Sequence, residues 1–134
     1  MLLYIGSNNW EFDPRCVDDK TQSPLSILEL GAGTGIVTSR IVETVASGAN
    51  DVVISTDLPE VCPLLKANLK DLLGQSHQRA NGLSIRPLAW GNWDHTARIL
   101  EDLQGCSISE QKSQCAPWLT HIVCSDLVGA IIEL

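Results

Sequence analysis

The sequence predicts an α/β fold in which a parallel sheet carries helices on both faces. Short apolar runs at residues 25–30, 51–56 and 82–88 alternate with segments whose apolar residues recur at helical spacing. The first run ends in the glycine-rich turn 31–35, with glycines at alternate positions. The first two runs are separated by the length of a β-α-β unit, whose strands are parallel. Together these observations favour a parallel sheet covered by helices.

The chain is predicted to hold one α/β domain preceded by an arm. Residues 1–24 show no regular pattern and are expected to form an N-terminal arm, and residues 25–134 the domain. After the strand over residues 25–30, Thr34 can cap a helix, and Gly48 is a natural stop for it.

The middle of the chain repeats this strand and helix pattern. We expect a second helix over residues 58–73, with a loose first turn and regular helix from about Pro63, whose ring suits a helix start. Gly74 is expected to follow its end. After the third strand, Asp94 can cap a further helix that ends at Gly105.

The glycine turn is the candidate ligand site, because parallel sheets bind ligands at the carboxyl ends of their strands. Its glycines let backbone N–H groups approach a ligand at the positive end of a helix. Ile36 occupies the third small-residue position of a dinucleotide-binding turn, and no phosphate-loop lysine follows. The turn therefore suits a nucleoside-like ligand without a pyrophosphate. Glu29, just before it, could accept a hydrogen bond from a ligand ammonium.

Four other side chains have a structural alternative beside the functional one. Asp57 can bind both ribose hydroxyls or cap a helix, and the two roles are compatible. Trp90 can stack on an adenine or fill the core, and Trp10 can line a pocket or pack on the domain edge. Asp126 follows a fourth strand expected over residues 118–125. Its carboxylate can orient an amine substrate or cap a helix.

Composition narrows the class of protein. The net charge of −7 disfavours a nucleic-acid partner, and no apolar run is long enough for a membrane span. The five cysteines are odd in number and form no C-x-x-C pair, and the histidines lack metal-ligand spacing. We therefore expect reduced thiols, no metal site, and a location in the cytoplasm or also the nucleus.

Four blocks of sequence, in this order, resemble the class I S-adenosylmethionine-dependent methyltransferases. They lie at residues 27–35, 56–61, 88–91 and 124–128. Within that class they are most similar to the methyltransferase-like protein-lysine methyltransferases. The resemblance implies a Rossmann-like sheet of seven strands, S-adenosyl-L-methionine as cofactor, and a lysine side chain of a protein as substrate.

The resemblance also implies roles for individual residues. Gly31, Ala32 and Gly33 would contact the methionine part of the cofactor, and Asp57 would bind its ribose. Trp90 would flank the adenine, and Ser125 would border the pocket. Asp126 would act as the catalytic residue near the acceptor amine, and Trp10 would match a tryptophan upstream of the turn.

Two departures from the family pattern keep other interpretations open. Gly129 stands where the family has an aromatic residue, and few residues follow it. We therefore expect residues 25–134 to be an incomplete methyltransferase domain, the N-terminal part of the seven-stranded fold. The alternative is a truncated, non-catalytic remnant that acts as a protein-interaction module. A nicotinamide-dependent oxidoreductase is disfavoured by Ile36, and an RNA-base methyltransferase by the negative charge.

Overall fold

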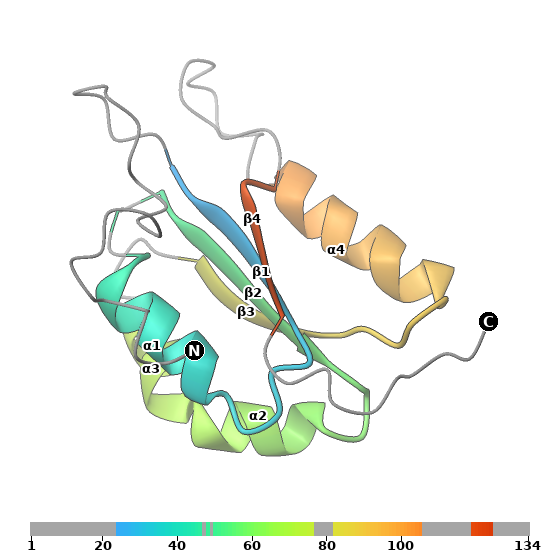
Figure 1. Ribbon diagram of the computed structural model, residues 1–134, viewed down its shortest axis with the longest axis horizontal. Helices are drawn as coiled ribbons and strands as arrows, with labels where there is room; N and C mark the ends of the chain where they lie inside the picture. The colour runs from blue at the N-terminus through green and yellow to red at the C-terminus, as the bar shows by residue number, and fades with distance from the viewer. Residues whose placement is uncertain (1–23, 47, 49, 77–81, 106–118, 125–134) are drawn as a thin grey trace.

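The computed structural model describes residues 24–46, 48, 50–76, 82–105 and 119–124. In chain order the elements are β1 (Ser26–Leu30), α1 (Ile36–Thr44), β2 (Val52–Asp57), α2 (Cys62–Asn68), α3 (Lys70–Ser76), β3 (Gly82–Pro87), α4 (Trp93–Gly105) and β4 (His121–Cys124). The strands form one sheet in the order β3-β2-β1-β4, and every pairing is parallel. The predicted α/β class and parallel sheet are confirmed (Figure 1).

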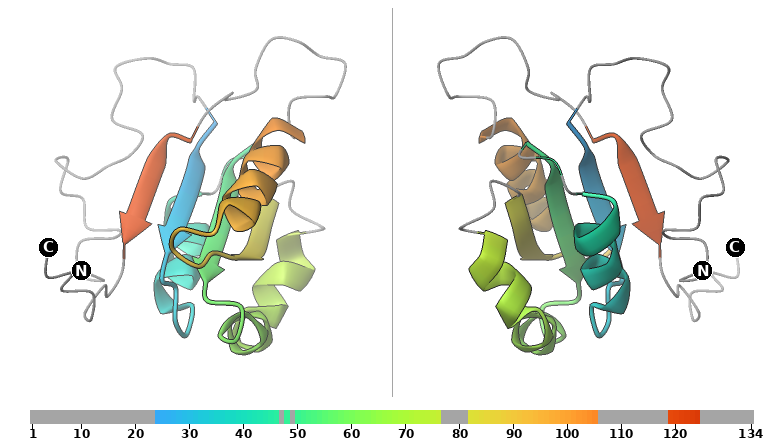
Figure 2. Two further views of the ribbon diagram at one scale, coloured as in Figure 1. Left: turned by 90° about the vertical axis from the view of Figure 1, so that its right-hand side faces the viewer. Right: turned by 90° about the vertical axis from the view of Figure 1, so that its left-hand side faces the viewer.

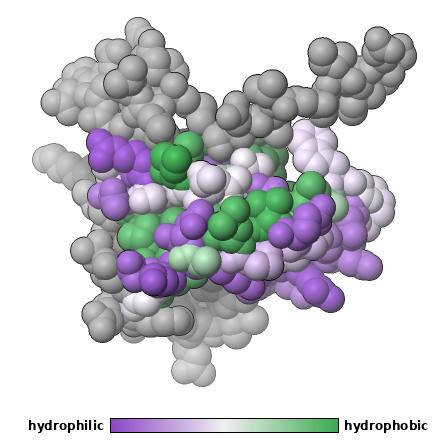
Figure 3. Space-filling view, turned by 90° about the horizontal axis from the view of Figure 1, so that it is seen from below, coloured by the Kyte–Doolittle hydropathy of each residue, from purple (hydrophilic) through white to green (hydrophobic). Residues whose placement is uncertain are grey.

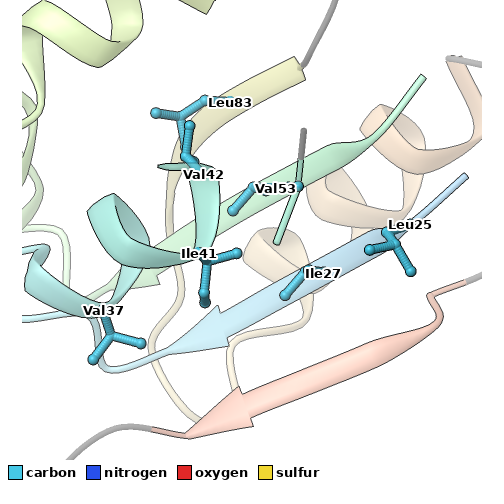
Figure 4. Packing of buried hydrophobic residues seen from close by; sticks show 8 residues of the cluster. Leu25, Ile27, Val37, Ile41, Val42, Val53 and Leu83 are labelled. Atoms are coloured by element: carbon cyan, nitrogen blue, oxygen red, sulfur yellow. The ribbon is translucent and has the colours of Figure 1, made fainter. Parts of the chain in front are cut away.

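One face of the sheet packs against α1, α2 and α3. Odd-numbered residues of the strands, such as Ile27 and Val53, point to this face because side chains alternate along a strand. They meet Val37 and Ile41 of α1, as Figure 4 shows. The helical spacing of these apolar residues, read from the sequence, therefore matches the face that α1 buries.

The opposite face packs against α4. Leu28 and Ile54 point to it and contact Ile99, and all three are buried. Figure 2 shows α4 on one side of the sheet and α1 on the other. The predicted helices on both faces are confirmed, which gives the Rossmann-like arrangement.

The predicted second helix is two helices in the structure. Helix α2 begins beside Pro63, as expected, and ends at Asn68. The next residue, Leu69, has a φ of −99° and a ψ of 11°, which lie outside the helical region. Helix α3 continues through Gly74, so the prediction that this glycine follows the helix is wrong. A glycine inside a helix costs only about 1 kcal/mol, and Leu72 and Leu73 pack against the core and hold α3 in place.

Two predicted helix caps are also wrong. The N-cap of α1 is Gly35, which has no side chain, and Thr34 instead accepts a 2.9 Å hydrogen bond at its carbonyl from Asn68 Nδ2. Helix α4 begins at Trp93, and Asn92 Oδ1 accepts a 3.2 Å hydrogen bond from the His95 N–H. Asn92 thus caps α4, and Asp94 lies in its first turn.

The structure describes only part of the predicted arm and of the range predicted for the fourth strand. Residues 1–23 of the predicted arm lie outside the described residues, and the fourth strand occupies residues 121–124 of its predicted range. Among the described residues, no helix has the length and apolar character needed to cross a bilayer.

Candidate functional site

The candidate site lies at the carboxyl ends of β1, β2 and β3. These ends point the same way in Figure 2, toward the lower end of the molecule. Figure 3 shows that end from below, where hydrophobic residues cross the middle and hydrophilic residues border them. Exposed apolar side chains of the segments that begin at this end include Ile36, Leu58 and Leu64. The surface at this end of the sheet is therefore mixed, with exposed apolar side chains beside polar ones.

The glycine turn needs its glycines because three of its residues have positive φ. The φ angles are 68° at Gly31, 56° at Gly33 and 85° at Gly35. Side chains with a Cβ rarely adopt this region. The alternate glycines in the sequence therefore indicate a turn between β1 and α1 in which every second residue has a positive φ.

Two of these glycines face different surroundings. A Cβ built on Gly35 would lie 2.8 Å from Leu65 Cδ1 and 3.0 Å from Leu69 Cγ, so α2 packs directly on this backbone. Among the residues that the structure describes, a Cβ built on Gly33 would meet nothing within 4 Å. Gly35 is therefore required for packing, whereas the space beside Gly33 is open for a ligand.

Hydrogen bonds fasten the turn to β2. The Ala32 N–H donates to the carbonyl of Thr56 at 2.9 Å, and the Gly33 N–H donates to Asp57 Oδ2 at 2.6 Å. The Gly35 N–H donates to the Ala32 carbonyl at 2.9 Å. In this structure all three N–H groups bond to acceptors of the protein itself, and these bonds hold the turn in its conformation.

Asp57 stands at the centre of this arrangement. Its Oδ1 accepts a 2.7 Å hydrogen bond from the Leu58 N–H, and its Oδ2 accepts the bond from Gly33. The N-cap of α2 is Val61, so Asp57 does not cap that helix. Each oxygen of an ionised carboxylate has a second lone pair, and the residue is half-buried. Asp57 can therefore accept two further hydrogen bonds from a ligand while holding the turn.

Glu29 lies beneath the turn and is fully buried. Its Oε2 accepts hydrogen bonds from Thr38 Oγ1 of α1 and, at 3.4 Å, from Ser55 Oγ of β2. The two hydroxyl groups lie 2.6 Å apart. The carboxylate thus ties β1, β2 and α1 together. Its contact with a ligand ammonium stays a prediction.

Sequence reasoning missed Thr38 and Ser55, although strand alternation gave part of the signal and the register in the structure gives the rest. Glu29 is odd-numbered like Leu25 and Ile27, so strand alternation places its side chain on the face of the sheet that packs against α1. The register pairs Glu29 directly with Ser55. A buried carboxylate on that face needs hydrogen-bond donors from the elements beside it, and these are the hydroxyls of β2 and α1.

The loop after β3 brings Trp90 to the same end of the sheet. The Leu88 N–H donates to the Asp57 carbonyl at 2.8 Å, which joins the start of the loop to the end of β2. The Ala89 N–H donates to His95 Nδ1 at 3.1 Å, and Gly91 turns the chain with a φ of 76°. Trp90 is 66% exposed, so the alternative of a core indole does not apply.

The structure thus brings together the glycine turn, Asp57 and the start of the Trp90 loop. Trp10, Ser125 and Asp126 lie outside the described residues, and their roles stay predictions. Within the ranges that the structure describes, no group of three His, Cys, Asp or Glu residues is arranged to hold a metal ion.

A family model described as lysine methyltransferase matches residues 3–103 of the chain. The chain belongs to the lysine methyltransferase family. The match confirms the resemblance to class I S-adenosylmethionine-dependent enzymes, and it covers the segment from β1 into α4, including the turn, Asp57 and Trp90. No match was found among curated proteins or among solved structures. The described sheet and its helices agree with the N-terminal part of a methyltransferase fold.

Proposed function

We propose that this lysine methyltransferase-family chain binds S-adenosyl-L-methionine at the carboxyl ends of β1, β2 and β3 and methylates a lysine side chain of a protein. The observation that carries the proposal is the hydrogen bond between the Gly33 N–H and Asp57 Oδ2 at 2.6 Å. It holds a carboxylate with spare acceptor sites against a glycine turn, which is the arrangement that nucleosides require in parallel α/β sheets.

The ribose would bind to Asp57. The carboxylate has one lone pair left on each oxygen after its bonds to Gly33 and Leu58. Two neighbouring hydroxyls, as on a ribose, can donate to those positions. Hydrogen bonds to an ionised acceptor are about twice as strong as neutral ones, so this contact should dominate cofactor affinity.

The two ends of the cofactor would lie on either side of Asp57. The open space beside Gly33 leaves room for the methionine part along Gly31, Ala32 and Gly33. The exposed indole of Trp90, in a loop joined to Asp57 through Leu88, offers a flat face to the adenine. The residues present therefore fit the cofactor in its polar and its aromatic parts.

When bound, the cofactor supplies an activated methyl group on a sulfonium. The protein's contribution is to hold a neutral lysine amine in line with that methyl group and to exclude water. Asp126 would orient the amine through its carboxylate, Ser125 would border the cofactor and Trp10 would line the pocket. Hydrogen bonds within the protein already hold the turn in its conformation, so little ordering of the turn would be required on binding.

Reduced thiols are compatible with the cytoplasm or nucleus, where we place the protein. Within the described residues, Cys62 and Cys124 are both free thiols. Intracellular compartments keep such thiols reduced.

A methyl-transfer assay with S-adenosylmethionine labelled in its methyl group tests the proposal. The chain is incubated with a cell extract, and the labelled proteins are hydrolysed to amino acids. We expect label in methyllysine with the wild-type chain and much less with Asp57→Ala. Label in another amino acid would contradict the lysine assignment. Cofactor binding without any transfer would favour the alternative of a non-catalytic interaction module.

A further inference from the structure

A separate hollow lies beside β3, at the edge of the sheet. Its volume is about 320 Å³, and it lies between Lys66 of α2 and the side of α4 that carries His95 and Arg98. Both helices contact β3, whose Ile85 and Pro87 form the apolar part of the lining. The hollow borders the carboxyl end of β3, which Pro87 ends, but neither the glycine turn, Asp57 nor Trp90 lines it.

The hollow concentrates positive charge in an acidic protein. The chain has a net charge of −7, yet three of the five lysines and arginines that the structure describes line this hollow. They are Lys66, Arg86 and Arg98. Positive charge gathered around a hollow favours an anionic ligand.

One of these cations is already paired. Arg86 Nε lies 2.5 Å from Asp102 Oδ2, and Arg86 Nη2 lies 3.2 Å from Asp102 Oδ1. This bidentate pair joins β3 to α4 and neutralises Asp102. Within the described residues, Lys66 and Arg98 form no ion pair. Against the single carboxylate of Glu101, they leave the hollow with a net positive charge.

His95 adds a neutral donor. Its Nδ1 accepts the hydrogen bond from the Ala89 N–H, so in the neutral ring the proton resides on Nε2. The lining therefore provides an ammonium, a guanidinium and an imidazole N–H, contributed by two helices. Three donors carried by two helices suit a tetrahedral oxyanion, which accepts several hydrogen bonds, better than a planar carboxylate, which one arginine can satisfy.

We propose that the hollow binds a phosphoryl group through Lys66, Arg98 and His95. A phosphate ion fills only part of about 320 Å³, so the space accommodates a larger molecule that carries the group. The two sources of this chemistry are free phosphate and a phosphorylated side chain of another protein. The proposal does not depend on the methyltransferase assignment.

The test is an NMR titration of the whole chain with inorganic phosphate at constant ionic strength, observing the His95 ring. We expect a saturable shift at His95 and none at His121, which lies on β4. Lys66→Gln with Arg98→Gln should weaken binding at least about tenfold, since two charge-assisted hydrogen bonds are lost. The control is Arg40→Gln with Lys70→Gln, which removes the same charge elsewhere and should bind like wild type.

Two results would overturn the proposal. One is a His95 shift that rises without saturation, and the other is equal weakening in the hollow variant and the control variant.

Selectivity is tested by titrating acetate and N-acetylphosphoserine amide against the same chain. Acetate binding as tightly as phosphate would contradict selectivity for a phosphoryl group. N-acetylphosphoserine amide binding more tightly than phosphate would indicate a phosphorylated side chain, and weaker binding would indicate free phosphate.

Discussion

The Gly33 N–H donates a 2.6 Å hydrogen bond to Asp57 Oδ2, which fastens the turn after β1 to the end of β2. The same carboxylate accepts the Leu58 N–H at 2.7 Å. One side chain therefore stabilises the turn and offers its remaining lone pairs to a ligand. Stability and cofactor binding should both respond to changes at this residue.

Asp57→Asn should lower the free energy of unfolding by about 1–2 kcal/mol, because the amide has a single oxygen for two N–H donors. Urea denaturation measures this. The control is Asp71→Asn, since Asp71 is exposed on α3 and should tolerate the change within about 0.5 kcal/mol. Equal unfolding midpoints for Asp57→Asn and wild type would show that the carboxylate does not hold the turn.

The two glycine substitutions Gly33→Ala and Gly35→Ala should differ in cost. Gly33→Ala should cost about 1–2 kcal/mol, the strain of a side chain at positive φ. Gly35→Ala adds a methyl group 2.8 Å from Leu65 Cδ1, so it should cost about 1–3 kcal/mol more. Chemical denaturation compares the two. A cost for Gly33→Ala equal to or greater than that for Gly35→Ala would contradict the described packing of α2.

Thr38→Val should destabilise the fold by about 1–3 kcal/mol, because it removes a hydroxyl bonded to the buried Glu29 carboxylate. Thr38→Ser keeps the hydroxyl and should cost less. Thr44→Val is a matched control on the exposed face of α1, where the hydroxyl bonds to the Arg40 carbonyl. Thermal unfolding at one pH ranks the three variants. If Thr38→Ser proved as damaging as Thr38→Val, the hydroxyl would not matter.

Burial raises the pKa of the Cys62 thiol above its ordinary value, with smaller opposing effects from the Asp57 carbonyl and Lys66. Folding therefore favours the protonated thiol. The stabilisation that comes from burying the protonated thiol is complete at pH values below the pKa of the Cys62 thiol in the unfolded chain, about 8.5. It is lost as the pH rises through the higher pKa of the thiol in the folded chain. The destabilisation caused by Cys62→Ala should thus shrink between pH 7.5 and pH 10, as measured by urea unfolding. A destabilisation that stays constant over this pH range would contradict the raised pKa of the Cys62 thiol.

The strands and the site end of the sheet could be predicted because their signals are local. Apolar runs define β1, β2 and β3, and the alternate glycines report positive φ in the turn. The position of Asp57 at the end of β2 follows from the same reading. The proximity of the Trp90 loop follows from the rule that carboxyl ends of parallel strands meet at one edge.

The rest depends on contacts between distant segments. Asn92 caps α4 in place of Asp94 because the side-chain oxygen of Asn92 reaches the His95 N–H. Which of the two residues caps the helix cannot be read from the composition of this segment. Gly74 does not stop α3, since packing of neighbouring leucines outweighs its low helix propensity. The hydroxyl partners of Glu29 lie on α1 and β2, and the pairing of Glu29 with Ser55 becomes visible only in the strand register.

Titration calorimetry with S-adenosyl-L-methionine tests the central proposal most directly. We predict saturable binding at one site on the wild-type chain and the same affinity for Asp71→Asn. Asp57→Ala should bind at least about tenfold more weakly, because charge-assisted hydrogen bonds to the ribose are lost. Circular dichroism confirms that each variant is folded. Absence of binding to the folded wild-type chain, or equal affinity for Asp57→Ala, would contradict a cofactor site built on Asp57 and the glycine turn.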